Sequence, residues 1–300
     1  MTVRIRRYRA ARMFRLLLVA AIALAACSAS DDTATSDAES STLPAATSGN
    51  ETGPSEIVQL LYVFDGDSIE VSRGDGSRAE VRLIGINAPE GDECHGDDAR
   101  NALEILLEDA SLTVVADGED TDRFGRLLRY VYANNRNINS ALVGSGDALA
   151  LQSGHELEPE FVSAGDRAAH DELGMWSPTA CGPQVIAPPV AIADYEFDPA
   201  GRDAENANDE WVAFTNESGT ADLSGFTLRD ESTQHRFVFP DGFTLAQGET
   251  VTVHSGCGAD SPGDLFWCAS DPVWSNGGDT IILQLPGGAV VLRERFAGNY

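Results

Sequence analysis

Three motifs, quoted in chain order, decide the fold: Phe64-Asp65-Gly66-Asp67-Ser68, Arg82-Leu83-Ile84-Gly85-Ile86-Asn87-Ala88-Pro89-Glu90 and Asp122-Arg123-Phe124-Gly125-Arg126. The residues around the first two motifs have the pattern of strands. An apolar run covers 57–64, and apolar residues alternate with polar ones over 68–73 and 78–84, on either side of the turn 74–77. Alternation with a period of two indicates strands that bury one face, so this region predicts a β-meander.

Further elements follow the meander and complete one domain, which we place at residues 56–183. Apolar spacing predicts helices at 98–109, 138–143 and 158–173 and strands at 112–116 and 127–133. Five strands with interleaved helices predict an α+β fold around a small barrel.

The polar residues of the three motifs suit the hydrolysis of a phosphodiester by a metal-activated site. Two acids lie at one turn, an arginine lies in each of the other two motifs, and Glu90 follows the strand-ending Pro89 on a loop. Taken singly, each feature is more commonly structural, since Asp-Gly-Asp is a frequent turn sequence and strand arginines usually face solvent. The ordered set of motifs favours a functional site.

From about Leu60 to Ser177 the chain resembles the staphylococcal (micrococcal) nuclease family, whose fold is an OB-fold barrel with helices. The resemblance rests on all three motifs in the family's order. It implies that Asp67, Asn87 and the main-chain carbonyl of Ala88 hold a calcium ion. It also implies that Glu90 is the general base and that Arg82 and Arg126 bind the phosphate. Calcium prefers hard oxygen ligands, and arginine offers bidentate donors to phosphate, which agrees with these roles.

The chain departs from the family pattern at three positions. Asn87 stands where the family usually has aspartate, so we expect weaker calcium binding. Phe124 replaces a tyrosine and cannot donate to a phosphate, and a second substrate-side tyrosine falls near Gln152. The base and both arginines are kept, which favours an active enzyme.

The N-terminus predicts export. Six arginines lie within the first fifteen residues, and an apolar run of eleven residues, Leu16–Ala26, precedes Cys27. The run is too short to span a bilayer and has the length of a signal-peptide core. Its end resembles the lipobox of bacterial lipoproteins, which implies cleavage before a lipidated Cys27 that anchors the chain to the membrane. An ordinary secretory signal is the alternative. Residues 1–27 are therefore expected to be the signal segment.

Residues 28–55 are rich in Ser, Thr, Ala and acids and predict a disordered tether. A coil of this length would span roughly 30 Å.

The chain is strongly acidic and contains no lysine. Without the six N-terminal arginines, 14 arginines face 48 acidic residues, a formal net charge of −34. Such a charge repels polyanions at long range and argues against a broad nucleic-acid groove, but not against a small phosphate site. We interpret it as adaptation to salt, which screens the repulsion.

Four cysteines remain after Cys27: Cys94, Cys181, Cys257 and Cys268. None has the CxxC spacing of a zinc site. Outside the cytoplasm two disulfides are expected, and the pairing Cys94–Cys181 and Cys257–Cys268 keeps each within one domain. Free buried thiols are the alternative.

After a linker at 184–188, the second domain at residues 189–300 shows only short β runs punctuated by Gly, Asp, Asn and Pro. This pattern predicts an all-β sandwich. The stretches 208–212, 222–230 and 276–279 resemble the lamin-tail domain, an immunoglobulin-like module of unknown ligand, which implies binding or anchoring. The acidic run 198–210 is expected to be a solvated loop, with calcium binding as the alternative.

Three functions stay open on sequence alone. The first is a lipid-anchored, extracytoplasmic, calcium-dependent endonuclease of low specificity, acting on DNA and RNA. The second is a catalytically weak nuclease-fold module that binds rather than cuts. The third places the main function in the second domain, as an adhesin.

Overall fold

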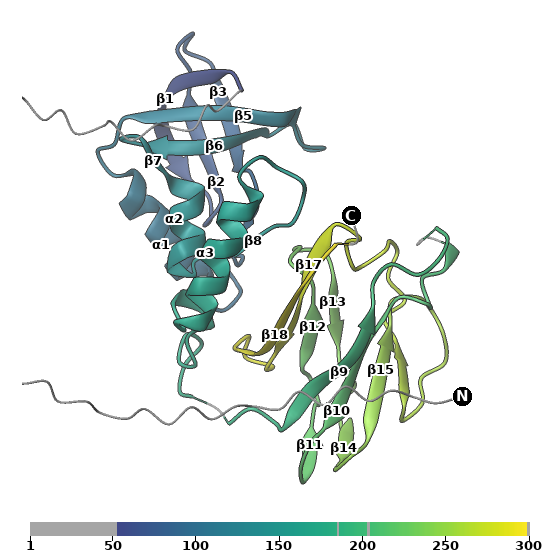
Figure 1. Cartoon of the computed structure of the whole chain (residues 1–300). Coiled ribbons are helices and arrows are strands. Elements are labelled where there is room, and N and C mark those ends of the chain that lie inside the picture. The colour runs from purple at the N-terminus through teal and green to yellow at the C-terminus, as the bar shows by residue number, and fades with distance from the viewer. Residues whose placement is uncertain (1–52, 185, 203–204, 299–300) are drawn as a thin grey trace, which may run out of the picture. The chain divides into compact units, whose positions relative to one another are not determined.

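The computed structural model describes residues 53–184, 186–202 and 205–298, which form a barrel domain followed by a β-sandwich domain (Figure 1). The predicted signal segment with Cys27, and the predicted tether as far as residue 52, lie outside the described residues. They stay predictions.

Five strands close the barrel of the first domain. They are β1 (Ser55–Val63), β2 (Ser68–Ser72), β3 (Arg78–Leu83), β5 (Leu112–Thr121) and β6 (Leu127–Ala133). Neighbouring strands pair antiparallel in the order β3-β2-β1-β5-β6, and a parallel pairing of β3 with β6 closes the ring. A further strand, β7 (Arg136–Asn137), pairs antiparallel with β6. Apart from this sheet, β4 (Ile86–Asn87) pairs with β8 (Leu149–Ala150). The predicted barrel is confirmed.

Three helices lie together against one end of the barrel (Figure 1). They are α1 (Gly96–Leu107), α2 (Ile138–Ser145) and α3 (Glu158–His170), followed by a 3₁₀ turn at Gly174–Trp176. Barrel side chains such as Ile69 and Val81 share one core with Leu103, Leu142 and Phe161 of the helices, all with no exposed surface. Each contributes about 1.5–3 kcal/mol of burial free energy, which fixes the barrel mouth relative to the helices.

Several element boundaries differ from the sequence prediction, and two of the differences have a clear local cause. Helix α1 begins two residues before the predicted start, at Gly96, where a Cβ atom would lie only 1.8 Å from the carbonyl oxygen of Glu90. A glycine is therefore required for this helix to begin against the Glu90 loop. Strand β5 runs on to Thr121, because the chain resumes pairing with Leu127 after an irregularity beyond Ala116.

The second domain is a sandwich of short strands (Figure 1). One sheet contains β9 (Val190–Glu196), β10 (Trp211–Asn216), β15 (Thr250–His254) and β16 (Asp264–Phe266). The other contains β12 (Thr227–Arg229), β13 (Arg236–Val238), β17 (Gly278–Gln284) and β18 (Val290–Ala297). A separate pair joins β11 (Thr220–Asp222) to β14 (Thr244–Ala246). Phe214, Val251 and Ile281 are buried in a single core between the sheets, so the predicted sandwich is confirmed.

One residue of the acidic run 198–210 is not solvated. Glu210 is fully buried and accepts hydrogen bonds from the main-chain nitrogens of Val273 and Trp274, at 3.1 and 3.2 Å. The expectation of a solvated loop was wrong for this residue, because its carboxylate satisfies buried amide groups of another loop.

Both predicted disulfides are present. Cys94 pairs with Cys181 and Cys257 pairs with Cys268, each within one domain. The first closes a separation of 87 residues and ties the loop after Glu90 to the segment that follows α3. It therefore restricts the unfolded chain over most of the first domain.

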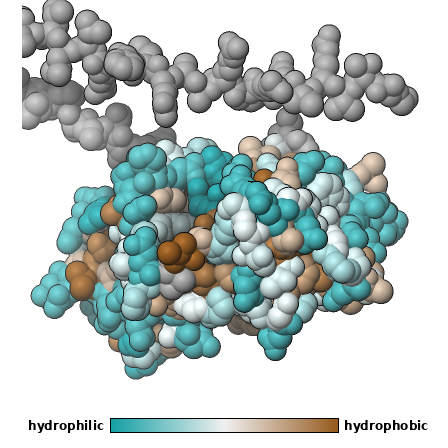
Figure 2. All heavy atoms as spheres, turned by 90° about the horizontal axis from the view of Figure 1, so that it is seen from below, coloured by the Kyte–Doolittle hydropathy of each residue, from teal (hydrophilic) through white to brown (hydrophobic). Residues whose placement is uncertain are grey.

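On the face drawn in Figure 2, hydrophilic residues predominate and apolar residues occur in small groups. Within the described part of the chain, no helix combines the length and the apolar character that crossing a bilayer requires.

Candidate active site

The turn between β1 and β2 carries the first acidic motif. The nitrogen of Phe64 donates to the carbonyl of Ser68 at 2.9 Å, and Asp65 Oδ1 accepts the nitrogen of Asp67 at 2.9 Å. A Cβ atom on Gly66 would lie 2.6 Å from the Cβ of Ala88, so the turn packs directly on the second motif. This close approach turns Asp67 inward, where it is 5% exposed.

The carboxylate of Asp67 joins two motifs. Its Oδ2 accepts the main-chain nitrogen of Ala88 at 2.7 Å, and its Oδ1 accepts the hydroxyl of Ser68 at 3.0 Å. Burial raises the pKa of Asp67 to about 6, and the neighbouring Arg82 offsets only part of that rise.

Arg82 lies at the centre of the cluster because β2 and β3 pair Ser68 directly with it. Its Nη2 is 2.9 Å from Asp67 Oδ2 and donates to Asn87 Oδ1 at 3.2 Å. Its Nη1 donates to two main-chain carbonyls, those of Leu83 and Ile86, at 2.9 Å each. A planar guanidinium held by four acceptors has little rotamer freedom left, so its position is fixed before any ligand binds.

Arg126 reaches the same cluster from the third motif. Its Nε pairs with Asp122 Oδ2 at 2.7 Å, and its Nη1 donates to the hydroxyl of Ser68 at 3.4 Å. Phe124 is 70% exposed, and the guanidinium carbons of Arg123 and Arg126 lie 4.8 and 5.5 Å from its ring centre. The hairpin thus presents an aromatic ring flanked by two cations at the surface.

Glu90 lies on the loop after Pro89 and is exposed to solvent. Its partial burial, followed by repulsion from Asp65 and Glu93, raises its pKa above the ordinary value, while Arg82 lowers it. A raised pKa suits a carboxylate that takes a proton from water.

The sequence-predicted ligands fit a calcium ion in donor type. Asp67 offers a carboxylate and Asn87 an amide oxygen, and both oxygens converge on the same positively charged nitrogen of Arg82. Calcium takes hard oxygen ligands, and in this structure these two oxygens are held by the guanidinium of Arg82. Among the described residues no cluster of three or more His, Cys, Asp or Glu side chains has the arrangement of a metal site, so any ion here depends on Asn87 and main-chain oxygen.

The structure brings five of the six predicted site residues together, and the sixth, Glu90, lies two residues after Ala88. Asp67, Asn87, Ala88 and Arg82 are in direct contact, and Arg126 joins them through Ser68. Ser68 itself was not predicted, although its position beside the second acid of the turn and opposite Arg82 was available from strand register.

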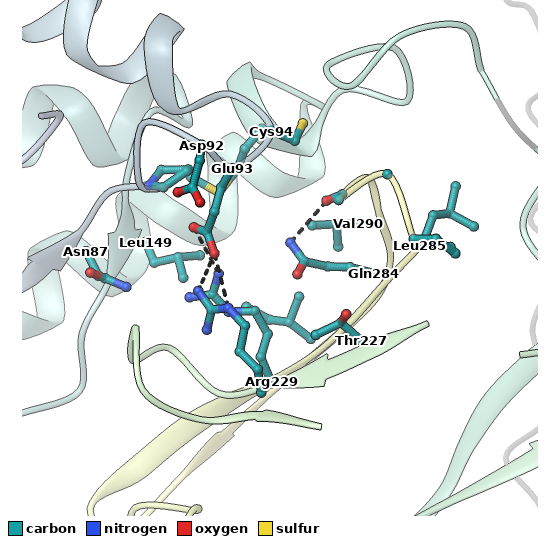
Figure 3. Close-up of a pocket in the computed structure, with 17 residues that line it drawn as sticks. Asn87, Asp92, Glu93, Cys94, Leu149, Thr227, Arg229, Gln284, Leu285 and Val290 are labelled. Atoms are coloured by element: carbon teal, nitrogen blue, oxygen red, sulfur yellow. Dashed lines mark hydrogen bonds and ion pairs between the residues drawn. The ribbon is translucent and has the colours of Figure 1, made fainter. Parts of the chain in front are cut away.

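Sequence reasoning also missed the contribution of the sandwich domain. The amide Nδ2 of Asn87 donates to the carbonyl of Glu231 at 2.8 Å. A cavity of about 270 Å³ lies beside this contact and is lined from both domains, including Asn87, Glu93 and Arg229 (Figure 3). A main-chain acceptor has no signature in a sequence, so no pattern could have predicted it.

The described chain is similar to known proteins in both of its domains. Residues 80–178 match the model of the staphylococcal nuclease homologue family, and residues 186–295 match the Lamin Tail Domain. The first range contains Arg82, Asn87, Glu90 and Arg126, whereas Asp67 lies before it.

Individual relatives cover the first domain. Protein ParB of Escherichia coli is 35% identical over 129 residues, which are 40% of this chain and 71% of that protein. An uncharacterized endonuclease of Haemophilus influenzae is 27% identical over 119 residues, covering 40% of this chain and 65% of that protein. Thermonuclease of Staphylococcus hyicus is 25% identical over 142 residues, which are 45% of this chain and 83% of that protein. The chain therefore belongs to the staphylococcal nuclease family through its first domain and carries a lamin tail domain after it.

Proposed function

We propose that this chain is an extracytoplasmic, calcium-dependent endonuclease that hydrolyses DNA and RNA with low sequence specificity. The observation that carries the proposal is the continuous series of contacts from Arg126 through Ser68, Asp67 and Arg82 to Asn87. It gathers two arginines and two oxygen ligands in one cluster beside an exposed glutamate. The nuclease relatives support hydrolytic chemistry at the level of the family.

The residues divide the reaction between them. Arg82 and Arg126 bind the phosphate and stabilise the charge that develops on its oxygens. Glu90 takes a proton from a water molecule, whose oxygen bonds to phosphorus. The bond from phosphorus to the 5′ oxygen breaks, the departing oxygen takes up a proton, and a 3′-phosphate remains. Calcium held by Asp67, Asn87 and the Ala88 carbonyl would supply further positive charge to the phosphate.

The place of action belongs to the same proposal. The apolar run before Cys27 supports export and a lipid anchor in the bacterial cell membrane. Two disulfides support an oxidising compartment. In that setting calcium is available without a high-affinity site.

A non-catalytic binding module is the second candidate, and two observations favour it. Asn87 removes one negative charge from the ligand set, and the net charge, −28 for the whole chain and −34 without the six N-terminal arginines, opposes polyanion binding. The retention of Glu90 and both arginines favours the enzyme over this alternative.

End-group analysis of single-stranded DNA products separates the two. With calcium, the wild type should yield fragments with 3′-phosphates, and none with EDTA. Glu90→Gln should cut at least about a hundredfold more slowly. The matched control is Glu104→Gln, because Glu104 lies on α1 and pairs with Arg100 away from the cluster; it should cut like the wild type. No calcium-dependent cutting by the wild type at any salt concentration would favour the binding module instead.

A further inference from the structure

The side-chain amide of Asn87 is held from both sides. Its Nδ2 donates to the carbonyl of Glu231 in the lamin tail domain at 2.8 Å, and its Oδ1 accepts Nη2 of Arg82 at 3.2 Å. The residue is 3% exposed. Only one orientation satisfies both partners, because the carbonyl requires a donor and the guanidinium requires an acceptor. The contact with Glu231 therefore directs the oxygen of Asn87 towards Arg82.

Glu231 is itself fixed against the nuclease domain. Its carboxylate accepts the main-chain nitrogen of Gln152 at 3.0 Å and the Gln152 amide at 3.3 Å. Within its own domain it accepts the hydroxyl of Thr280 at 2.6 Å. Gln152 follows β8, the strand that pairs with β4 and so with Asn87. The same lamin-tail residue thus holds both strands of this small ladder.

Ion pairs and apolar contacts between the two domains surround the hydrogen bond between Asn87 and Glu231. Glu93, three residues after the candidate base, pairs with Arg236 and lies 3.9 Å from Arg229 (Figure 3). Asp166 on α3 pairs with Arg293 and Arg295, each at 2.8 Å. The apolar part of the contact joins Leu149 and Met175 of the nuclease domain to Ile282 of the lamin tail domain. The contact is continuous from α3 to the Asn87 loop.

The contact leaves three residues of the motifs exposed. Glu90 is exposed, and so are Phe64 and Phe124 of the two neighbouring motifs. A substrate can therefore reach Glu90 while the lamin tail domain contacts Asn87. The lamin tail domain thus contacts Asn87 without covering these exposed residues.

We propose that the lamin tail domain positions the Asn87 side chain of the nuclease site. Asn87 is the residue through which the two domains are coupled. An aspartate here would set a carboxylate oxygen against the carbonyl of Glu231, a repulsive buried contact. Compared with an aspartate, the amide of Asn87 lacks one negative charge for a metal ion. In exchange, it can donate a hydrogen bond to the lamin tail domain. The calcium readout of this inference rests on the proposed function, whereas its coupling readout does not.

The coupling readout is calorimetric unfolding of the full mature chain. The wild type should unfold in one cooperative transition. Asn87→Asp should separate it into two, with the first lower by about 5 °C or more. Asn216→Asp is the matched control, because Asn216 is equally buried and donates its amide to a carbonyl, that of Leu245, inside the lamin tail domain. It should lower the transition temperature and keep a single transition. A single transition in Asn87→Asp, at the wild-type temperature, would overturn the coupling.

Titration calorimetry with calcium tests whether the lamin tail domain positions Asn87. The variant used changes no candidate calcium ligand. Arg236→Gln removes the pair with Glu93 from the lamin-tail side. If the docked domain positions Asn87, calcium affinity should fall about tenfold, as for the loss of partners that orient metal ligands. Unchanged affinity in a variant that unfolds in two transitions would overturn the positioning role. Absence of calcium binding in the wild type would instead contradict the proposed function, and would leave the unfolding result to decide the coupling.

Discussion

Gly66 is the point where the acidic turn is packed most tightly against the Asn87 loop. A Cβ atom there would lie 2.6 Å from the Cβ of Ala88 and 2.8 Å from the Cβ of Ala99 on α1. Ordinary contact begins at 3.4 Å, so the neighbours must separate by 0.8 and 0.6 Å, the differences from that distance. The φ angle of Gly66 is not positive, so Gly66→Ala adds crowding without backbone strain.

The crowding predicts a loss of both stability and activity. Overpacking of this kind costs about 1–3 kcal/mol. A shift of about 1 Å at a reacting centre can lower the rate about a hundredfold, and here Asp67 and Ala88 are moved apart directly. Thermal unfolding and the initial rate of single-stranded DNA cleavage measure the two effects.

The matched control is Gly74→Ala, in the turn between β2 and β3. A Cβ on Gly74 meets nothing within 4 Å, and its φ is also not positive. It should leave activity unchanged and stabilise the fold by about 0.4–1 kcal/mol, through the unfolded state. Wild-type stability and rate in Gly66→Ala would refute the packing of the turn on the Asn87 loop.

Other changes test the remaining parts of the site and the fold. Arg126→Lys should lower the cleavage rate about a hundredfold, since a lysine cannot give the phosphate the fork of donors; a rate within twofold of wild type would remove Arg126 from the site. Burial raises the pKa of Asp67 to about 6, so protons compete with calcium below that pH, and the dissociation constant measured by calorimetry should rise about tenfold per pH unit there; a constant that is flat from pH 7 to 5 would contradict the assignment. Replacing Cys94 and Cys181 together by serine should destabilise the fold by about 2–5 kcal/mol in chemical denaturation, because the bridge spans 87 residues, and an unchanged midpoint would show that the bridge restricts little.

The placement of Arg82 and Arg126 was predictable because these residues lie in strands and turns with strong local patterns. Alternation over β2 and β3 places Arg82 opposite Ser68, and Gly125, with φ of 86°, allows the hairpin turn that carries Arg126. Local rules of this kind decide most of the barrel. They also explain why the disulfides could be paired, since each joins cysteines of one domain.

The rest depended on contacts between distant segments. Asn87 was interpreted only as a weakened metal ligand, and its second partner is a main-chain carbonyl 144 residues further along the chain. The three-residue strands β11, β14 and β16 are too short to show a period, and pairing partners define them instead. Glu210 was assigned to a solvated run because its charge suggests the surface, whereas amide groups from 273 and 274 make its burial favourable.

The rate of single-stranded DNA hydrolysis against free calcium, at low and at high salt, tests whether this cluster is a calcium-dependent nuclease. We predict no cutting in EDTA, saturation at calcium concentrations on the order of 0.1–1 mM, and faster cutting when salt screens the net negative charge of the chain. Glu90→Gln should remove at least about 99% of the rate at saturating calcium. Cutting that is independent of calcium, or no cutting by the wild type at any salt concentration, would contradict the assignment.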